Sequence, residues 1–218
     1  MNKPALIVAR YNEDMEWTKE FTHSASLYIY NKGEPNIDCY KQLENVGRES
    51  HTYIKFILDH YENLPIHNIF VQGDAPCWRH RGILNEIKSA IKTPPTKTYF
   101  SFIGSFNLED FKVKGTNVPD FIASEFPIYQ KTPDFVYTHL LKRDSSIIAD
   151  IEYTVAPCAC FYVHRDNILR HSKEAYQRIY EEHYDPIHVV GPGTVVQFAG
   201  TMEYSWHLIL DDIYYLNK

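Results

Sequence analysis

The first 75 residues alternate between short apolar runs and amphipathic stretches, and this alternation restricts the folds open to the chain. The apolar runs at residues 5–10, 26–33 and 67–74 are predicted to be strands. The stretches at 12–21 and 47–63 have the spacing of helices. Strands and helices in alternation, joined by short connections, favour an α/β sheet with parallel neighbouring strands.

The second part of the chain is less regular. Residues 93–150 contain a turn-rich break and aromatic loops. Regular structure is expected again as a strand at 159–165, a helix at 165–184 and a final helix in MEYSWHLILDDIYY. A chain of 218 residues fits a single domain.

Composition argues against several classes of function. The formal charge is −6 without a Lys/Arg run or basic stripe, so we expect no nucleic-acid partner. No window reaches the ~18 apolar residues of a membrane span, and the amino terminus turns polar too soon for a signal peptide. The four cysteines are interpreted as buried thiols of a reducing compartment, so a cytoplasmic location is expected. The sequence has no Walker loop, dinucleotide fingerprint, Gly-x-Ser-x-Gly elbow or kinase motif set.

The stretch NVGRESH, at the start of the second predicted helix, gathers groups that bind anions. The first amides of a helix lack internal partners and lie at the positive end of its dipole. Gly47 allows a close backbone approach, and the Arg48 guanidinium fits phosphate oxygens. His51 follows three residues later, on the same helical face. Together they predict a diphosphate site.

The same stretch also has a structural interpretation. Asn45 would cap the helix, and Arg48 would form a surface ion pair with Glu44 or Glu49. Spacing alone leaves both interpretations open.

Three further residues could carry chemistry. Asp74 ends a predicted strand, where a carboxylate can hold Mg²⁺ or Mn²⁺. Glu203 and His207 are four residues apart on one face of the final predicted helix, as a general base and a metal or phosphate ligand would be. Glu203 would lie near the positive end of this helix, which favours its ionised form. The alternatives are an ordinary turn acid at Asp74 and a structural hydrogen bond between Glu203 and His207.

Four segments together resemble a family of glycosyltransferase-like domains found in fungi and large algal viruses. They are IVARYNEDMEW, IYNKGE, NVGRESHTYIKFILDHYENLP…FVQGD and CACFYVHRDNILR, and they cover roughly residues 4–75 and 155–210. The resemblance implies a GT-A-type fold, with a Rossmann-like, mixed but mostly parallel central sheet flanked by helices. It also implies a nucleotide-sugar donor and a Mn²⁺ or Mg²⁺ ion.

The resemblance further implies a role for individual residues. Those that bind the nucleotide-sugar would be Ala9, Arg10, Tyr11, Asn12, Glu13, Arg48, His51, Gln72 and Gly73. Asp74 and His207 would hold the metal, Glu203 would be catalytic, and the FYVHRDNI corner would flank the acceptor. The family's usual Asp-x-Asp signature is replaced by Gln-Gly-Asp, so the second metal ligand is open between His207 and Asp38.

We therefore expect a cytoplasmic, hexosyltransferase-like enzyme that moves a sugar from a UDP-sugar to a glycan, a glycoprotein or another hydroxyl acceptor. The nucleotide-sugar half would span about 1–92 and the acceptor-side half about 93–218. The alternatives are a metal-dependent hydrolase of phosphates or sugar phosphates, and a non-catalytic nucleotide- or carbohydrate-binding module.

Overall fold

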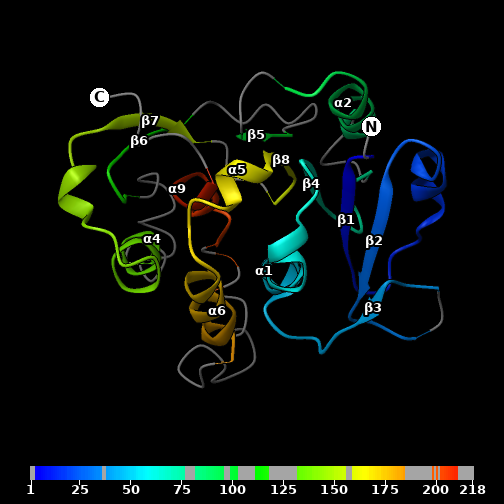
Figure 1. The fold of residues 1–218 in the computed structure, drawn as a ribbon, viewed down its shortest axis with the longest axis horizontal. Helices are drawn as coiled ribbons and strands as arrows, with labels where there is room; N and C mark the ends of the chain where they lie inside the picture. Colours follow the sequence, from blue (N-terminus) through cyan, green and yellow to red (C-terminus); the bar gives the residue numbers. More distant parts are fainter. Residues whose placement is uncertain are drawn as a thin grey trace.

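A six-stranded mixed sheet, in the order β3-β2-β1-β4-β8-β5, forms the centre of the protein (Figure 1). Its strands are β1 (Ala5–Arg10), β2 (Ser26–Asn31), β3 (Lys41–Gln42), β4 (His67–Gln72), β5 (Tyr99–Ser101) and β8 (Phe161–His164). β8 is antiparallel to both of its neighbours, whereas β3, β2, β1 and β4 pair in parallel. The computed structural model describes residues 3–35, 38–76, 82–95, 99–102, 111–117, 132–155, 159–184, 198, 200 and 202–210.

Helices cover both faces of this sheet. Ala5 and Ile7 of β1 pack into one buried cluster together with α1 (Arg48–His60), α6 (Lys173–Glu182) and α9 (Trp206–Leu210). Leu6 and Val8 point the other way, into a second cluster with η1 (Glu16–Phe21) and α2 (Ile83–Lys92). A strand buried on both faces is apolar throughout, which explains the continuous run at residues 5–8. The predicted α/β class, a Rossmann-like, mostly parallel sheet flanked by helices, is confirmed.

The remaining described elements lie beyond the sheet or connect its parts. They are η2 (Tyr61–Asn63), β6 (Phe111–Lys114), α4 (Thr132–Phe135), the π-helix η5 (Val136–Leu140), η6 (Ser145–Ile147), β7 (Glu152–Val155) and α5 (Arg165–Ile168). β6 and β7 form a separate antiparallel pair on the side of the molecule opposite β2 and β3 (Figure 1). Among the described residues, no helix is long and apolar enough to cross a membrane.

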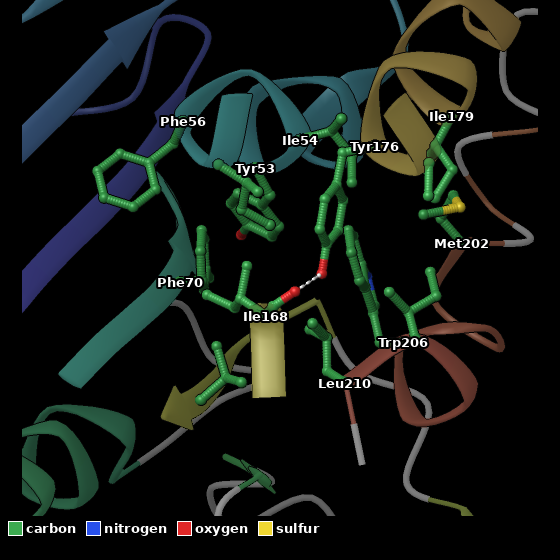
Figure 2. Close-up of a cluster of buried hydrophobic side chains, with 14 of the residues drawn as sticks. Tyr53, Ile54, Phe56, Phe70, Ile168, Tyr176, Ile179, Met202, Trp206 and Leu210 are labelled. Atoms are coloured by element: carbon green, nitrogen blue, oxygen red, sulfur yellow. Dashed lines mark hydrogen bonds between the residues drawn. The ribbon is translucent and has the colours of Figure 1, made fainter. Parts of the chain in front are cut away.

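Beneath α1, side chains from the first part of the chain pack against side chains from its last described segment. Figure 2 shows Met202 and Trp206 packed beside α6, and the Trp206 ring centroid lies 5.9 Å from that of Tyr53 in α1. In the same cluster the Tyr176 hydroxyl donates a 2.8 Å hydrogen bond to the carbonyl of Ile168. The segment 202–210 is therefore held against α1 by large buried side chains.

Several predicted helices differ from the observed ones. The stretch 12–21 is a 3₁₀-helix that begins at Glu16. The helix expected at 165–184 is two helices, α5 and α6, because Ser172 caps a new start by accepting a hydrogen bond from the Ala175 amide. Residues 203–205 form a turn, so the final helix begins only at Trp206. Parts of the loop-rich region, at 96–98, 103–110 and 118–131, lie outside the described residues.

The FYVHRDNI corner does not lie where the resemblance implied. β8 runs antiparallel to β4, and His164 at its end pairs with His67 at the start of β4. The corner therefore lies at the edge of the sheet opposite the carboxyl ends of β1 and β4. The expectation that it flanks the same site is wrong, because reversing a strand moves its carboxyl end to the other edge.

Candidate functional site

A cavity of about 300 Å³ lies where the order of the parallel strands reverses. The chain runs from β1 outward to β2 and β3, and then returns to β4 on the other side of β1. In open α/β sheets such a switch point leaves a crevice at the carboxyl ends of the strands. The cavity occupies this crevice, and its walls come from the residues after β1, the start of α1 and the end of β4.

Most of the residues expected at the site do line this cavity. β1 and the loop after it contribute Ala9, Arg10, Tyr11 and Glu13. The end of β4 contributes Gln72, Gly73 and Asp74, and α1 contributes Arg48. Lys32, Asn45 and Glu49 also line the cavity but were missed as ligand-binding residues. The signal for Lys32 is its place near the end of the strand predicted at 26–33, and the signal for Glu49 is its place beside Arg48.

Arg10 braces the loop after β1. Its guanidinium is buried, donates a 2.6 Å hydrogen bond to Asn31 Oδ1 and donates another, of 2.9 Å, to the carbonyl of Glu13. The Glu13 carboxylate in turn accepts a 2.6 Å hydrogen bond from the Tyr11 amide. Tyr11 is left 51% exposed above the cavity. Arg10 and Glu13 therefore shape the loop, whereas Tyr11 presents a free ring to a ligand.

A second hollow, of about 210 Å³, adjoins the cavity on the β2 side. Tyr11, Lys32 and Asn45 line both spaces and so form the boundary between them. Asn12 lines the second hollow, where its side-chain oxygen accepts a 3.0 Å hydrogen bond from the Glu34 amide. Gly33 is required here, because a Cβ at this position would lie 1.5 Å from the carbonyl oxygen of Tyr11.

A left-handed turn brings α1 to the cavity. Gly47 has φ 60° and Arg48 has φ 45°, so the chain turns sharply just before the regular helix. The buried Lys32 ammonium holds this turn by donating hydrogen bonds to the carbonyls of Val46 and Arg48. The residue that caps the helix is Gly47 and not Asn45, so that part of the structural alternative is wrong. Arg48 is exposed at the cavity wall, as an anion-binding residue would be.

His51 does not belong to this site. Its side chain is fully buried, lies 3.0 Å from the Tyr184 hydroxyl and stacks on Tyr180, with 4.6 Å between the ring centroids. Burial lowers its pKa to about 2, so the ring is neutral. We expected His51 and Arg48 to share one face of the helix, which requires regular helical backbone at both positions. The left-handed backbone of Arg48 breaks that spacing and leaves His51 against α6.

Opposite charges are buried together at the base of the cavity. Burial lowers the pKa of Lys32 to about 7, although the Glu49 carboxylate opposes this shift. Burial raises the pKa of Glu49, while a hydrogen bond from Gln72 and the charges of Arg48 and Lys32 act in the other direction. The proton content of the site therefore responds to pH.

Glu203, from the last described segment of the chain, lies near enough to Glu49 and Arg48 to feel their charges, but it does not line the cavity. It is partly buried, and burial and the nearby Glu49 carboxylate raise its pKa to about 7, against the attraction of Arg48. We expected a helix dipole to favour its ionised form. That expectation is wrong, because Glu203 lies in the turn before α9 and its pKa is raised.

The two residues expected to hold a metal are not both at the cavity. Asp74 is exposed and lines it, whereas His207 is buried in α9 and does not. Burial lowers the pKa of His207 to about 3. Asp38 is exposed and is not part of the cavity wall either. Within the part of the chain that the structure describes, no group of three or more His, Cys, Asp or Glu side chains could hold a metal ion.

The chain matches the model of a known protein family. One family model matches residues 6–215, which is nearly the whole chain. The chain belongs to the DUF3431 family. The family is described as a protein of unknown function (DUF3431), and no curated protein matches the chain. The matched region includes the whole cavity wall and Glu203, so the candidate site lies inside the DUF3431 part of the chain.

Proposed function

We propose that this DUF3431 chain is a glycosyltransferase that takes a sugar from a nucleotide-sugar, most simply a UDP-sugar, and transfers it to a glycan or glycoprotein hydroxyl. The observation that carries the proposal is the two-part cavity at the strand switch point, with Arg48 and the start of α1 at its wall. Crevices of this kind are where α/β sheets bind nucleotides. The resemblance to glycosyltransferase-like domains supports the same function and adds the GT-A type to the proposal.

The shape of the site suits an elongated ligand with a charged centre. The hollow beside β2 offers the Tyr11 ring for stacking against a base, together with polar groups from Asn12 and Glu34. Arg48, at the start of α1, lines the adjoining cavity and would bind the diphosphate. It would also stabilise the charge that develops on the departing nucleotide diphosphate, which is the main electrostatic need of the transfer.

Glu203 is proposed as the general base that takes the proton of the acceptor hydroxyl. A pKa of about 7 suits a group that accepts a proton near neutral pH. Replacing Glu203 with Gln should leave UDP affinity intact and lower the rate of transfer at least ~10²-fold. Near-normal turnover by this variant would exclude the role.

We expect Mn²⁺ to tighten the binding of a UDP-sugar through Asp74, although the described residues do not assemble a set of ligands around it. No step of the proposed mechanism passes through a metal ion. Calorimetry with a UDP-sugar, in Mn²⁺ and in EDTA, tests the prediction. Equal affinities would remove Asp74 as a metal ligand.

The function is tested by combining binding with product analysis. A panel of nucleotide-sugars should include one that raises the melting temperature of the protein, since a ligand of the native state stabilises it by mass action. That donor is then incubated with the protein, with and without glycan acceptors. Transfer that requires an acceptor supports the proposal. Release of free sugar without an acceptor would indicate a hydrolase, and binding without turnover would indicate a binding module.

A cytoplasmic location also belongs to this proposal. Among the described residues, Cys39 and Cys160 are free thiols, which suits a reducing compartment. Cys160 is buried as expected, but Cys39 is only partly buried, and Cys77 and Cys158 lie outside the described residues. Cell fractionation tests the location, and recovery of the protein from the secretory lumen would contradict it.

A further inference from the structure

Glu49 is a buried acid at the cavity wall, and the proposed transfer reaction gives it no role. It lies in the first turn of α1 and is only 7% exposed. Its Oε1 atom is buried and has no hydrogen-bond partner among the described residues. A buried polar atom without a partner is energetically unfavourable and calls for an explanation, such as a ligand. The cavity that Glu49 lines supplies the place for one.

The layout of the two spaces indicates which part of a ligand reaches Glu49. Tyr11, Lys32 and Asn45 mark the junction between them. With the nucleoside in the hollow beside β2, the diphosphate lies at this junction, next to Arg48. The rest of a nucleotide-sugar then continues towards β4, where Glu49 and Gln72 line the wall.

The chemistry of Glu49 favours hydroxyl groups over other partners. An ionised carboxylate repels phosphate oxygens but accepts hydrogen bonds from hydroxyls. A protonated carboxyl also bonds hydroxyls, because a hydroxyl both donates and accepts. Glu49 can therefore hydrogen-bond a sugar hydroxyl whether its carboxyl group is protonated or ionised. Its raised pKa is thus compatible with sugar binding. In the part of the chain that the structure describes, the acids and histidines around it do not form a metal-binding group.

We propose that Glu49, at the cavity wall, binds the hydroxyl groups of the transferred sugar and so helps to select the donor. This inference rests on the proposed function, because it requires a nucleotide-sugar in the cavity. It assigns to Glu49 a contact with the sugar, distinct from the base role of Glu203 and from the diphosphate contact of Arg48.

The test compares UDP with UDP-sugars by calorimetry. The probes are UDP, UDP-glucose, UDP-galactose and UDP-N-acetylglucosamine. The wild-type protein should bind at least one UDP-sugar more tightly than UDP. Glu49→Gln should weaken binding of that sugar nucleotide about 10-fold, the scale of a hydrogen bond to a charged group, and change UDP affinity less than about 2-fold. The matched control is Glu44→Gln, an exposed acid in the loop before α1, which should change neither affinity.

A second variant keeps the test decisive if Glu49→Gln does not fold, which a melting curve shows. Glu49→Asp keeps the carboxyl group but withdraws its oxygens by one methylene, so the same selective loss is expected. Equal losses for UDP and the UDP-sugar, or no loss at all, would overturn the assignment of Glu49.

The inference and the function can fail separately. If the wild-type protein transfers sugar and Glu49→Gln binds the donor normally, the inference alone is wrong. If the wild-type protein binds none of the four probes, the UDP-sugar function and the role of Glu49 are both wrong.

Discussion

At the scale of single residues, the site contains buried charged groups that stabilise one another electrostatically. Lys32 is buried against two backbone carbonyls, and the nearby Glu49 carboxylate favours its charged form. Arg48 opposes the rise in pKa of both Glu49 and Glu203. Buried charges persist only where they are paired or hydrogen-bonded. Removing one member should therefore change the behaviour of the others.

Replacing Arg48 with Ala tests the diphosphate contact. UDP binding should weaken by about 1.5–3 kcal/mol, the scale of a charge-assisted hydrogen bond, while uridine binding should barely change. Calorimetry measures both affinities. Arg165→Ala is a suitable control, because Arg165 follows β8 at the opposite edge of the sheet. A parallel loss of UDP and uridine binding would make Arg48 a structural residue.

The raised pKa of Glu203 predicts a pH dependence of stability. Below about pH 4.5 the carboxyl is protonated in both the folded and the unfolded chain. Between about 4.5 and 7 the folded chain keeps a proton that the unfolded chain has lost, so the free energy of unfolding falls as pH rises. Urea titrations across this range should show the wild type losing on the order of 2 kcal/mol relative to Glu203→Gln.

The control for this experiment is Glu62→Gln, at an exposed position in η2. Its difference from wild type should stay nearly constant over the same pH range. If the Glu203→Gln difference is equally flat, Glu203 is not buried beside Glu49 in solution.

At the scale of elements, the end of α6 clamps the start of α1. Ser50 Oγ lies 2.8 Å from His183 Nε2, and His51 Nε2 lies 3.0 Å from the Tyr184 hydroxyl. Gly47 packs directly on the His183 ring, where a Cβ would come within 2.2 Å of Cδ2. The turn that presents Arg48 is therefore fixed from both sides, by Lys32 and by α6.

Gly47→Ala should disturb this clamp. The left-handed backbone alone costs roughly 1–2 kcal/mol for a residue with a Cβ, and the contact with His183 adds to it. Gly82→Ala is the matched control, since Gly82 also has a positive φ and starts a helix, yet a Cβ added there would meet no atom of the described residues within 4 Å. Urea denaturation should show a larger loss for Gly47→Ala, accompanied by weaker UDP binding. Equal losses would mean that α6 yields to the extra methyl group.

At the scale of the whole molecule, the sequence predicts the sheet better than the site. Apolar runs reveal β1 and β4, and the polar residues that follow them do line the cavity. The direction of β8 could not be inferred, because an apolar run carries no sign of parallel or antiparallel pairing. In the sequence, Glu49 resembles an exposed acid in the first turn of a helix. It is buried in the structure because the backbone makes a left-handed turn at Arg48. The electrostatic effect of Glu49 on Glu203 joins distant segments and leaves no local pattern in the sequence.

The predicted boundary near residue 92 does not separate two cores, because residues on both sides of it pack into the same buried cluster. The inner face of α1 is covered by residues from the second part, including Phe161, Tyr176 and Trp206. A fragment of residues 1–95 would expose Tyr53 and Ile54, so it should lack a cooperative urea transition and should not bind UDP. Circular dichroism and calorimetry measure both properties. The full chain, cleaved after residue 95 with both pieces present, should stay folded, because the contacts between the parts remain. A fragment that unfolds cooperatively and binds UDP as the full chain does would show that the first part is an independent domain.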